Sequence, residues 1–239
     1  MALNANQSAA SSGGLNWHYE GPNGPNAWGS LSDSYASCAT GKHQSPINIT
    51  GGSSGAHPIL QTFYRPTRLV IGNNDRTIWI DYQNKSAIRI GDHRYLLKSI
   101  DLHTPSEHQL NGKSFPIEIQ FLHQNKDGEI AMIAVFGQTT EKENELISHF
   151  WRHLPRVATP TRMYRNIYIH AESLLPENRH FFRYQGSLTN PPCSEKVIWH
   201  VMKEPIGFSQ NQIRKLQNIF RKNNRPLQPL NGRAIVSSR

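Results

Sequence analysis

Polar side chains occur at alternate positions in two stretches whose other residues favour a β-strand. Asp101 and His103 are two residues apart in the first stretch, and Glu118 and Gln120 are two residues apart in the second. Residues two apart on a strand lie on the same face, so the side chains of each pair can act together. A solvated outer face is nevertheless sufficient to explain Glu118 and Gln120, because apolar residues alternate with them.

These stretches belong to a series of segments with strand-like patterns in the middle of the chain. A nearly continuous apolar run over residues 129–136 predicts a strand that is buried on both faces. Alternation and β-branched runs predict further strands at residues 77–82, 87–90, 95–103 and 115–123.

Apolar residues at helical spacing occur in two other places. They predict a short helix around residues 146–154, ended by Pro155, with Leu146 on its packed face, and a second helix around residues 213–220 with Ser209 as its N-cap. The chain has no repeat and no break in composition. We therefore expect a flexible segment over residues 1–14 and one sheet-dominated domain over residues 15–239.

The 239-residue chain carries a formal net charge of +9, which favours acidic glycans, nucleic acid or anionic lipid as partners. A basic protein without any such partner is an equally good explanation. No run of 18 apolar residues is present, so we expect no transmembrane segment. The first 14 residues lack an apolar core and do not form a signal peptide as they stand.

The chain has two cysteines, Cys38 and Cys193. If they form a disulfide, the protein belongs to an oxidising compartment, whether secreted or periplasmic. Two buried free thiols are the alternative.

Several ordered motifs resemble bacterial-type α-class carbonic anhydrases. They are Trp17-His-Tyr-Glu-Gly-Pro-Asn-Gly-Pro, Gly41-Lys-His-Gln-Ser-Pro-Ile-Asn-Ile, His103-Thr-Pro-Ser-Glu-His and Tyr184-Gln-Gly-Ser-Leu-Thr-Asn-Pro-Pro-Cys. The resemblance extends from about residue 15 to 235. It implies a mainly β (α+β) single domain, with a central twisted, largely antiparallel sheet and short surface helices. It also implies a disulfide between Cys38 and Cys193, as in exported relatives.

The chemistry of that family requires three neutral histidines on zinc and a zinc-bound water that attacks CO2. Laid on this chain, the three ligand positions are Asp101, His103 and Gln120, so only one histidine is retained. Aspartate adds negative charge and glutamine offers only a neutral oxygen, so this set is a weak zinc site. Ser99 stands where the family has a glutamine that orients the first ligand, whereas the orienting Glu118 persists.

Other family positions are also changed. Arg76 replaces the proton-shuttle histidine and cannot relay protons. Three further replacements, Trp79, Leu122 and Met132, make the pocket more crowded, and Asn190 replaces a threonine beside the substrate.

Some family positions are kept. Leu188 and Trp199 match pocket walls, and Thr189 and Glu107 match the pair that orients the zinc-bound hydroxide. We interpret the last two as a vestige, in which each satisfies the other by a buried hydrogen bond. His108 and His123 match internal, hydrogen-bonded histidines.

Three hypotheses follow. The first is a related protein without CO2 hydratase activity, a pseudoenzyme with no cofactor and a binding or structural role. The second is a metalloenzyme with an unusual Asp101–His103–Gln120 site, which holds zinc or a harder metal. The third is a storage or assembly subunit that uses the fold as a scaffold.

For the binding role, the partner is an acidic glycan or protein that meets a basic surface rather than the pocket. A solvated face with dispersed charges is the alternative. The residues that could form this surface are Arg152, Arg156, Arg162, Arg165, Arg214, Lys215, Arg221, Lys222, Arg225 and Arg233.

Overall fold

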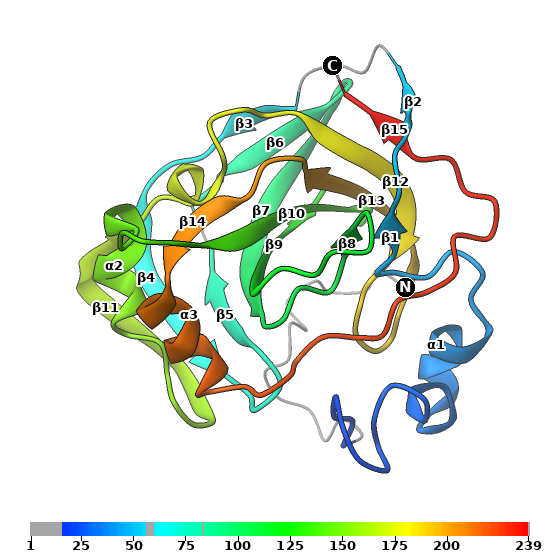
Figure 1. The fold of residues 1–239 in the computed structure, drawn as a ribbon, viewed down its shortest axis with the longest axis horizontal. Coiled ribbons are helices and arrows are strands. Elements are labelled where there is room, and N and C mark those ends of the chain that lie inside the picture. Colours follow the sequence, from blue (N-terminus) through cyan, green and yellow to red (C-terminus); the bar gives the residue numbers. More distant parts are fainter. Residues whose placement is uncertain (1–15, 56–59, 83, 239) are drawn as a thin grey trace.

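A large twisted sheet runs through the molecule (Figure 1). The structure is a computed structural model that describes residues 16–55, 60–82 and 84–238, so the segment predicted to be flexible lies outside the described residues. In spatial order the strands of the sheet are β11 (Thr159–Ile169), β4 (Thr67–Asn73), β5 (Ile78–Asp81), β7 (His93–His103), β9 (Ile117–Gln124), β10 (Ile130–Thr140), β13 (Glu195–Met202), β12 (Phe181–Ser187), β15 (Val236–Ser237) and β2 (Ser53–Ser54).

Most neighbouring strands are antiparallel, but β10 pairs in parallel with β13, so the sheet is mixed. Shorter elements surround it: β14 (Ile206–Ser209) beside β10, β3 (Gln61–Phe63) and β6 (Ala87–Ile90) beside β7, and a separate pair of β1 (Asn48–Ile49) and β8 (Gln109–Leu110). The helices are α1 (Ser37–Thr40), α2 (Glu145–Trp151) and α3 (Gln210–Gln217), with 3-10 turns at Trp28–Ser30, Asp33–Tyr35 and Ala171–Leu174.

The strand patterns in the sequence are confirmed as β5, β6, β7, β9 and β10. The apolar run in β10 is buried on both faces because each face meets a different hydrophobic cluster. Ile133 and Val135 belong to the larger cluster, and Met132 and Phe136 belong to the smaller one.

Both predicted helices are present. Ser209 caps α3 as expected, since its side chain accepts from the backbone N–H of Gln212 and the Gln212 side chain returns the bond. In α2, Ile147, Phe150 and Trp151 are buried, but Leu146 is 65% exposed. The prediction that Leu146 belongs to the packed face was therefore wrong, because it lies in the first turn and faces solvent.

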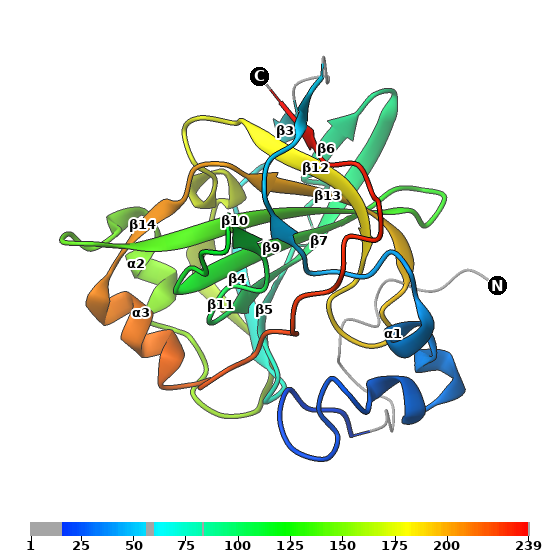
Figure 2. The same ribbon diagram turned by 45° about the vertical axis from the view of Figure 1, so that its right-hand side comes forward.

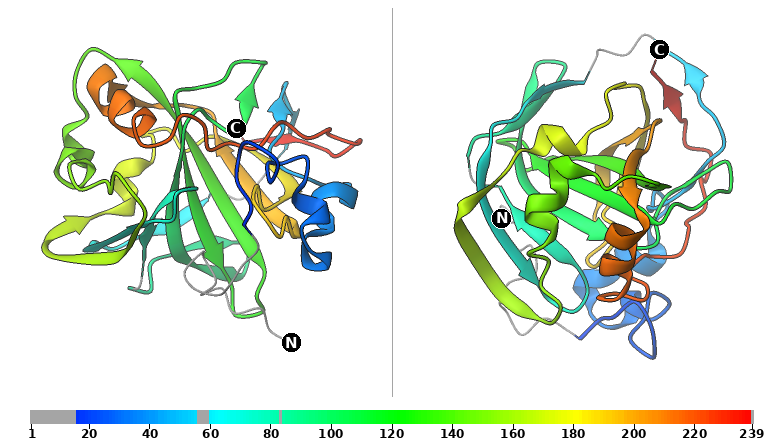
Figure 3. Two further views of the ribbon diagram at one scale, coloured as in Figure 1. Left: turned by 90° about the horizontal axis from the view of Figure 1, so that it is seen from below. Right: turned by 60° about the vertical axis from the view of Figure 1, so that its left-hand side comes forward.

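The sheet separates two packed layers. Figure 3 (left) shows α2 and α3 on one side of the strands and α1 on the other. On the α1 side, Trp17, Tyr19 and Trp28 pack edge to face around the disulfide. Figure 2 shows this segment beside the chain that leads to the C-terminus.

The disulfide implied by the resemblance is present between Cys38 and Cys193, which are 155 residues apart. It ties α1 to the loop that follows β12. No helix in the described ranges is long and apolar enough to cross a membrane.

Replacing both cysteines by serine removes the constraint on this long loop in the unfolded chain. We expect the free energy of unfolding to fall by about 2–5 kcal/mol in urea titrations. Reduced wild-type protein is the control and should show the same loss. An unchanged midpoint in both samples would contradict the prediction.

His123 is buried in the core, where its Nδ1 bonds the carbonyl of Phe121 and its Nε2 bonds the hydroxyl of Tyr64, at 3.1 and 2.8 Å. The internal role predicted for it is confirmed. Burial favours the neutral ring and lowers the pKa of His123 to about 3.

The pKa of His123 is lower in the folded state than in the unfolded chain. The contribution of His123 to the free energy of unfolding is therefore complete above pH 6.5 and is lost as the pH falls towards 3. Between pH 6 and 4, the free energy of unfolding of the wild-type protein should fall by about 1.4 kcal/mol per pH unit more than that of His123→Gln. Urea midpoints at several pH values measure this difference. Parallel curves for the two proteins would exclude it.

Candidate functional site

Backbone pairing brings the predicted ligand positions onto one face of the sheet. Trp79 of β5 lies opposite Asp101 of β7, which lies opposite Gln120 of β9. In the next row on the same face, His103 lies opposite Glu118. The three positions that the sequence singled out are therefore direct neighbours.

A third row on this face brings together the predicted pocket residues Leu122, Met132 and Trp199. Leu188, Thr189 and Asn190 are in the loop after β12. The indole N–H of Trp199 donates to the carbonyl of Ser187 at 2.9 Å, which holds the start of this loop against the sheet.

This face of the sheet is covered. Glu118 is fully buried and Gln120 is 2% exposed, so their interpretation as a solvated outer face was wrong. The covering segment is the chain after α3, where Asn223 and Arg225 hydrogen-bond to residues of the site. The alternation of polar and apolar residues along β9 could not predict that a segment about 100 residues later in the sequence covers this face.

His103 is oriented by that segment. Its Nδ1 donates to the backbone carbonyl of Asn223 at 2.7 Å, which leaves Nε2 for other contacts. Burial alone would lower the pKa of His103, but the charge of Glu107 and the bond to Asn223 outweigh it and raise that pKa. Asp101 accepts from the Ser99 hydroxyl at 3.1 Å, and burial raises the pKa of Asp101 to about 6.

Gln120 joins two buried carboxylates. Its Nε2 donates to Glu107 at 2.7 Å and to Glu118 at 2.8 Å. Because carboxylate oxygens only accept, the amide nitrogen must face them. The second oxygen of Glu107 accepts the backbone N–H of Arg225 at 3.1 Å. Within the described ranges no hydrogen bond joins Thr189 to Glu107, so the predicted pairing of these two residues is replaced by the contact with Gln120.

Glu118 is held on its other side by His108. The backbone N–H and Nδ1 of His108 both contact the carboxylate at 2.8 Å, and Nε2 contacts the hydroxyl of Tyr184 at 2.6 Å. Burial alone would raise the pKa of Glu118, but the interaction with His108 and the bond from Gln120 lower it. The internal role predicted for His108 is confirmed.

Arg76 and Trp79 flank the site. The guanidinium of Arg76 lies 4.6 Å from the centre of the Trp17 ring and donates to the Trp17 carbonyl at 3.4 Å. The buried ring of Trp79 lies over Gly72 of β4, where an added Cβ would be 2.5 Å from a ring carbon.

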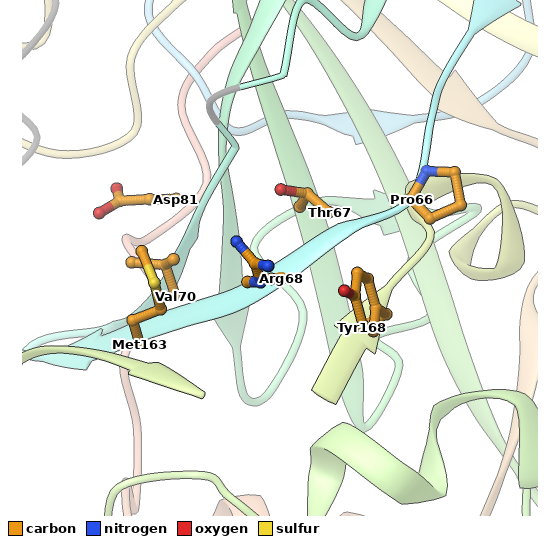
Figure 4. Close-up of a pocket in the computed structure, with 7 residues that line it drawn as sticks. All are labelled: Pro66, Thr67, Arg68, Val70, Asp81, Met163 and Tyr168. Carbon is orange, nitrogen blue, oxygen red and sulfur yellow. The ribbon is translucent and has the colours of Figure 1, made fainter. Parts of the chain in front are cut away.

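Beyond Trp79, a hollow of about 270 Å³ opens between β4, β5 and β11 (Figure 4). Asp81 lines it, and burial raises the pKa of Asp81 although Trp79 hydrogen-bonds to the carboxylate. None of the three ligand positions lines the hollow, whose other residues are Pro66, Thr67, Arg68, Val70, Met163 and Tyr168.

The comparisons with known proteins agree with this architecture. The model of the eukaryotic-type carbonic anhydrase family matches residues 23–239. This chain belongs to the α-class carbonic anhydrase family. The carbonic anhydrase of Neisseria gonorrhoeae is 35% identical to it over 99% of this chain and 93% of that protein. The carbonic anhydrase of Nostoc sp. is 36% identical over 94% of this chain and 86% of that protein.

Among solved structures, the α-carbonic anhydrase of Thermovibrio ammonificans, in complex with the inhibitor sulfanilamide, superimposes with a TM-score of 0.89. It is 38% identical, and the match covers 94% of this chain and all of that chain. The carbonic anhydrase fold expected from the resemblance is therefore confirmed.

Two residues of the site were missed in the sequence. Asn223 orients His103 and also accepts the backbone N–H of Thr104 at 2.7 Å. Arg225 appeared to be one of many surface cations, but it is 2% exposed and donates to Gln44 and to two backbone carbonyls. Neither has a sequence signal, because their partners are more than 100 residues away.

Replacing Gln120 by leucine leaves Glu107 and Glu118 without their shared donor. We expect a loss of about 3 kcal/mol in the free energy of unfolding, measured by urea titration at pH 7. Gln124→Leu is the matched control, since Gln124 is on the same strand but its side chain donates to the carbonyl of Gly128, at 3.3 Å, rather than to a buried carboxylate. Equal losses in the two variants would refute a special role of the Gln120 amide.

Proposed function

We propose that this member of the carbonic anhydrase family does not hydrate CO2 through zinc and instead has a binding or structural role. The observation that carries the proposal is the bond from the Gln120 amide to Glu107. In the family, the residue at this position is a histidine on zinc, and the glutamate corresponding to Glu107 helps to orient the zinc-bound hydroxide. Here the two positions satisfy each other.

The donor atoms do not fit the zinc of this family. They comprise one imidazole nitrogen of His103, a carboxylate of Asp101 and a neutral amide oxygen of Gln120, in place of three imidazoles. Amide oxygen is a poor zinc ligand beside imidazole, and a carboxylate makes the metal a weaker Lewis acid. In the described part of the chain, no three His, Cys, Asp or Glu side chains are grouped so that they could hold a metal ion.

The surroundings of the site support the same proposal. The guanidinium of Arg76 is stacked on Trp17 and has no acceptor for a proton, so it cannot relay protons to solvent. Leu122 of β9 and Met132 of β10 lie directly opposite each other, at positions where the family has the smaller valines of its CO2 pocket. The disulfide between Cys38 and Cys193 further supports an exported protein in an oxidising compartment.

A metal-dependent hydratase is the second candidate, and one observation favours it. The bond from His103 Nδ1 to Asn223 leaves Nε2 available, on the same face of β7 as Asp101. With two oxygen donors, such a site would select a harder metal than zinc.

Metal content distinguishes the two candidates. We expect no stoichiometric metal in protein purified without chelators and dialysed against trace zinc, as measured by elemental analysis. Retention of about one equivalent of metal per chain, together with CO2 hydration above the buffer rate, would refute the proposal.

Restoring the ligands is the complementary test. Asp101→His/Gln120→His should bind zinc more than about 100-fold tighter than wild type, because three imidazoles then share one face. The same variant with His103→Ala is the matched control and should lose this gain. If wild type and the restored variant bind zinc equally well, ligand loss is not the reason for inactivity.

A further inference from the structure

A group of cations lies where α2, the loop after it, β11 and α3 meet. Arg152, Arg156, Arg162 and Lys215 make up this group, which we call the α2–α3 cationic patch, and His153 lies among them. Figure 3 (right) views the molecule from this side, with α2, β11 and α3 next to one another.

The patch is held in place by specific contacts. The ammonium of Lys215 donates to the backbone carbonyl of Arg152 at 3.1 Å, which joins α3 to the end of α2. The guanidinium of Arg162 lies 5.0 Å from the centre of the Tyr164 ring, and that ring lies 4.6 Å from the ring of His153. Lys215 and Arg162 are therefore held by contacts of their own, and Arg152 and Arg156 lie close enough to Lys215 for their charges to act on it.

Among the described residues, no acidic side chain forms an ion pair with the patch. The ion pairs of the described residues involve His103, His108 and Arg179, which are elsewhere. Burial, and then the charges of Arg156 and Arg152, lower the pKa of Lys215. Like charges therefore repel one another here with no internal compensation.

The structure corrects the wider basic surface expected from the sequence. Arg225 is buried under Trp28, at 5.6 Å from the ring centre, and cannot meet a partner. Arg233 is tied to the carbonyls of Leu230, Gln185 and Gln44. Neither contributes to a common surface with the patch.

Stabilisation of helix ends and protection of an edge strand explain some of the cations in the patch, but not all of them. Arg152 at the end of α2 and Lys215 in the last turn of α3 are favourable beside helix C-termini. Arg162 lies on β11, an edge strand, where charge discourages strand pairing. Arg156 is exposed in the loop between α2 and β11, where it neither ends a helix nor belongs to the strand, yet it increases the repulsion on Lys215.

The chemistry of the patch selects one class of anionic partner. Tyr164, the aromatic side chain in contact with the patch, is covered by Arg162 and His153, and Tyr168 of β11 lines the hollow beside β4, so neither offers a free platform for stacking bases. Leu146, Val157 and Met163 are exposed on α2, on the loop after it and on β11, but these separate elements do not form the single apolar helix face that binds a lipid surface. What remains is a convergent set of guanidinium and ammonium donors, which suit closely spaced sulfates or carboxylates.

We propose that the α2–α3 cationic patch binds an acidic polysaccharide. This inference deepens the proposed binding role, but it does not involve the residues of the candidate metal site.

The test uses the full chain and heparin as the probe, with affinity measured by calorimetry at low salt and then at rising salt. Arg152→Gln/Arg156→Gln/Lys215→Gln should weaken binding about tenfold or more and reduce its salt dependence. The matched control, Arg89→Gln/Arg94→Gln/Lys126→Gln, removes the same charge from exposed positions outside the patch and should change the affinity less than about twofold.

Thermal unfolding of each variant checks that it is folded, and Arg156→Gln/Arg162→Gln replaces the first variant if it is not. If heparin binding weakens equally in the patch variant and in the control variant, the attraction depends on net charge alone and the proposal is overturned. The proposal is also overturned if the wild-type protein does not bind heparin at low salt. Tighter binding to phosphatidylserine vesicles or to duplex DNA than to heparin would also overturn it. Metal content, measured on the same samples, reports on the proposed loss of hydratase activity separately.

Discussion

The structure depends on two buried carboxylates, Glu107 and Glu118, that accept hydrogen bonds from the same side-chain amide, that of Gln120. A carboxylate removed from water needs donors, and Glu107 and Glu118 obtain theirs from Gln120 and from different segments of the chain. The backbone N–H of Arg225 is a second donor to Glu107, and His108 provides two donors to Glu118. A polar network of this kind stabilises a fold only if every member is satisfied, and here the amide completes it.

The network also explains how distant parts of the chain are held together. From His108 it passes through the hydroxyl of Tyr184 to Ser45, and Ser45 exchanges hydrogen bonds with Ser187. Arg225 connects the C-terminal segment to Gln44 and to the carbonyl of Cys38. The N-terminal segment, the loop after β12 and the C-terminal segment therefore meet around a polar centre, whereas the opposite face of the sheet is held by apolar packing with α2 and α3.

This division decides what could be predicted from the sequence. Alternation on β7 and β9 correctly predicted that Asp101 and His103 share a face, because that depends on local geometry alone. The burial of Glu118 could not be predicted, because alternation along β9 does not show whether its polar face is covered. The covering role of Arg225 could not be predicted either, because it contacts Glu107 across 118 residues. Motifs indicated the fold and the disulfide, whereas helical spacing alone did not show that Leu146, in the first turn of α2, faces solvent.

The contact between Trp79 and Gly72 means that substitutions at these two positions depend on each other. The indole occupies the space that any side chain on residue 72 would need, so Trp79 tolerates only glycine opposite it. A smaller residue at 79 would remove that restriction, but a side chain gained first at 72 would clash with the ring. The order of substitution is therefore fixed in one direction: the tryptophan must be lost before position 72 can diversify, and relatives with a side chain at 72 should lack a tryptophan at 79.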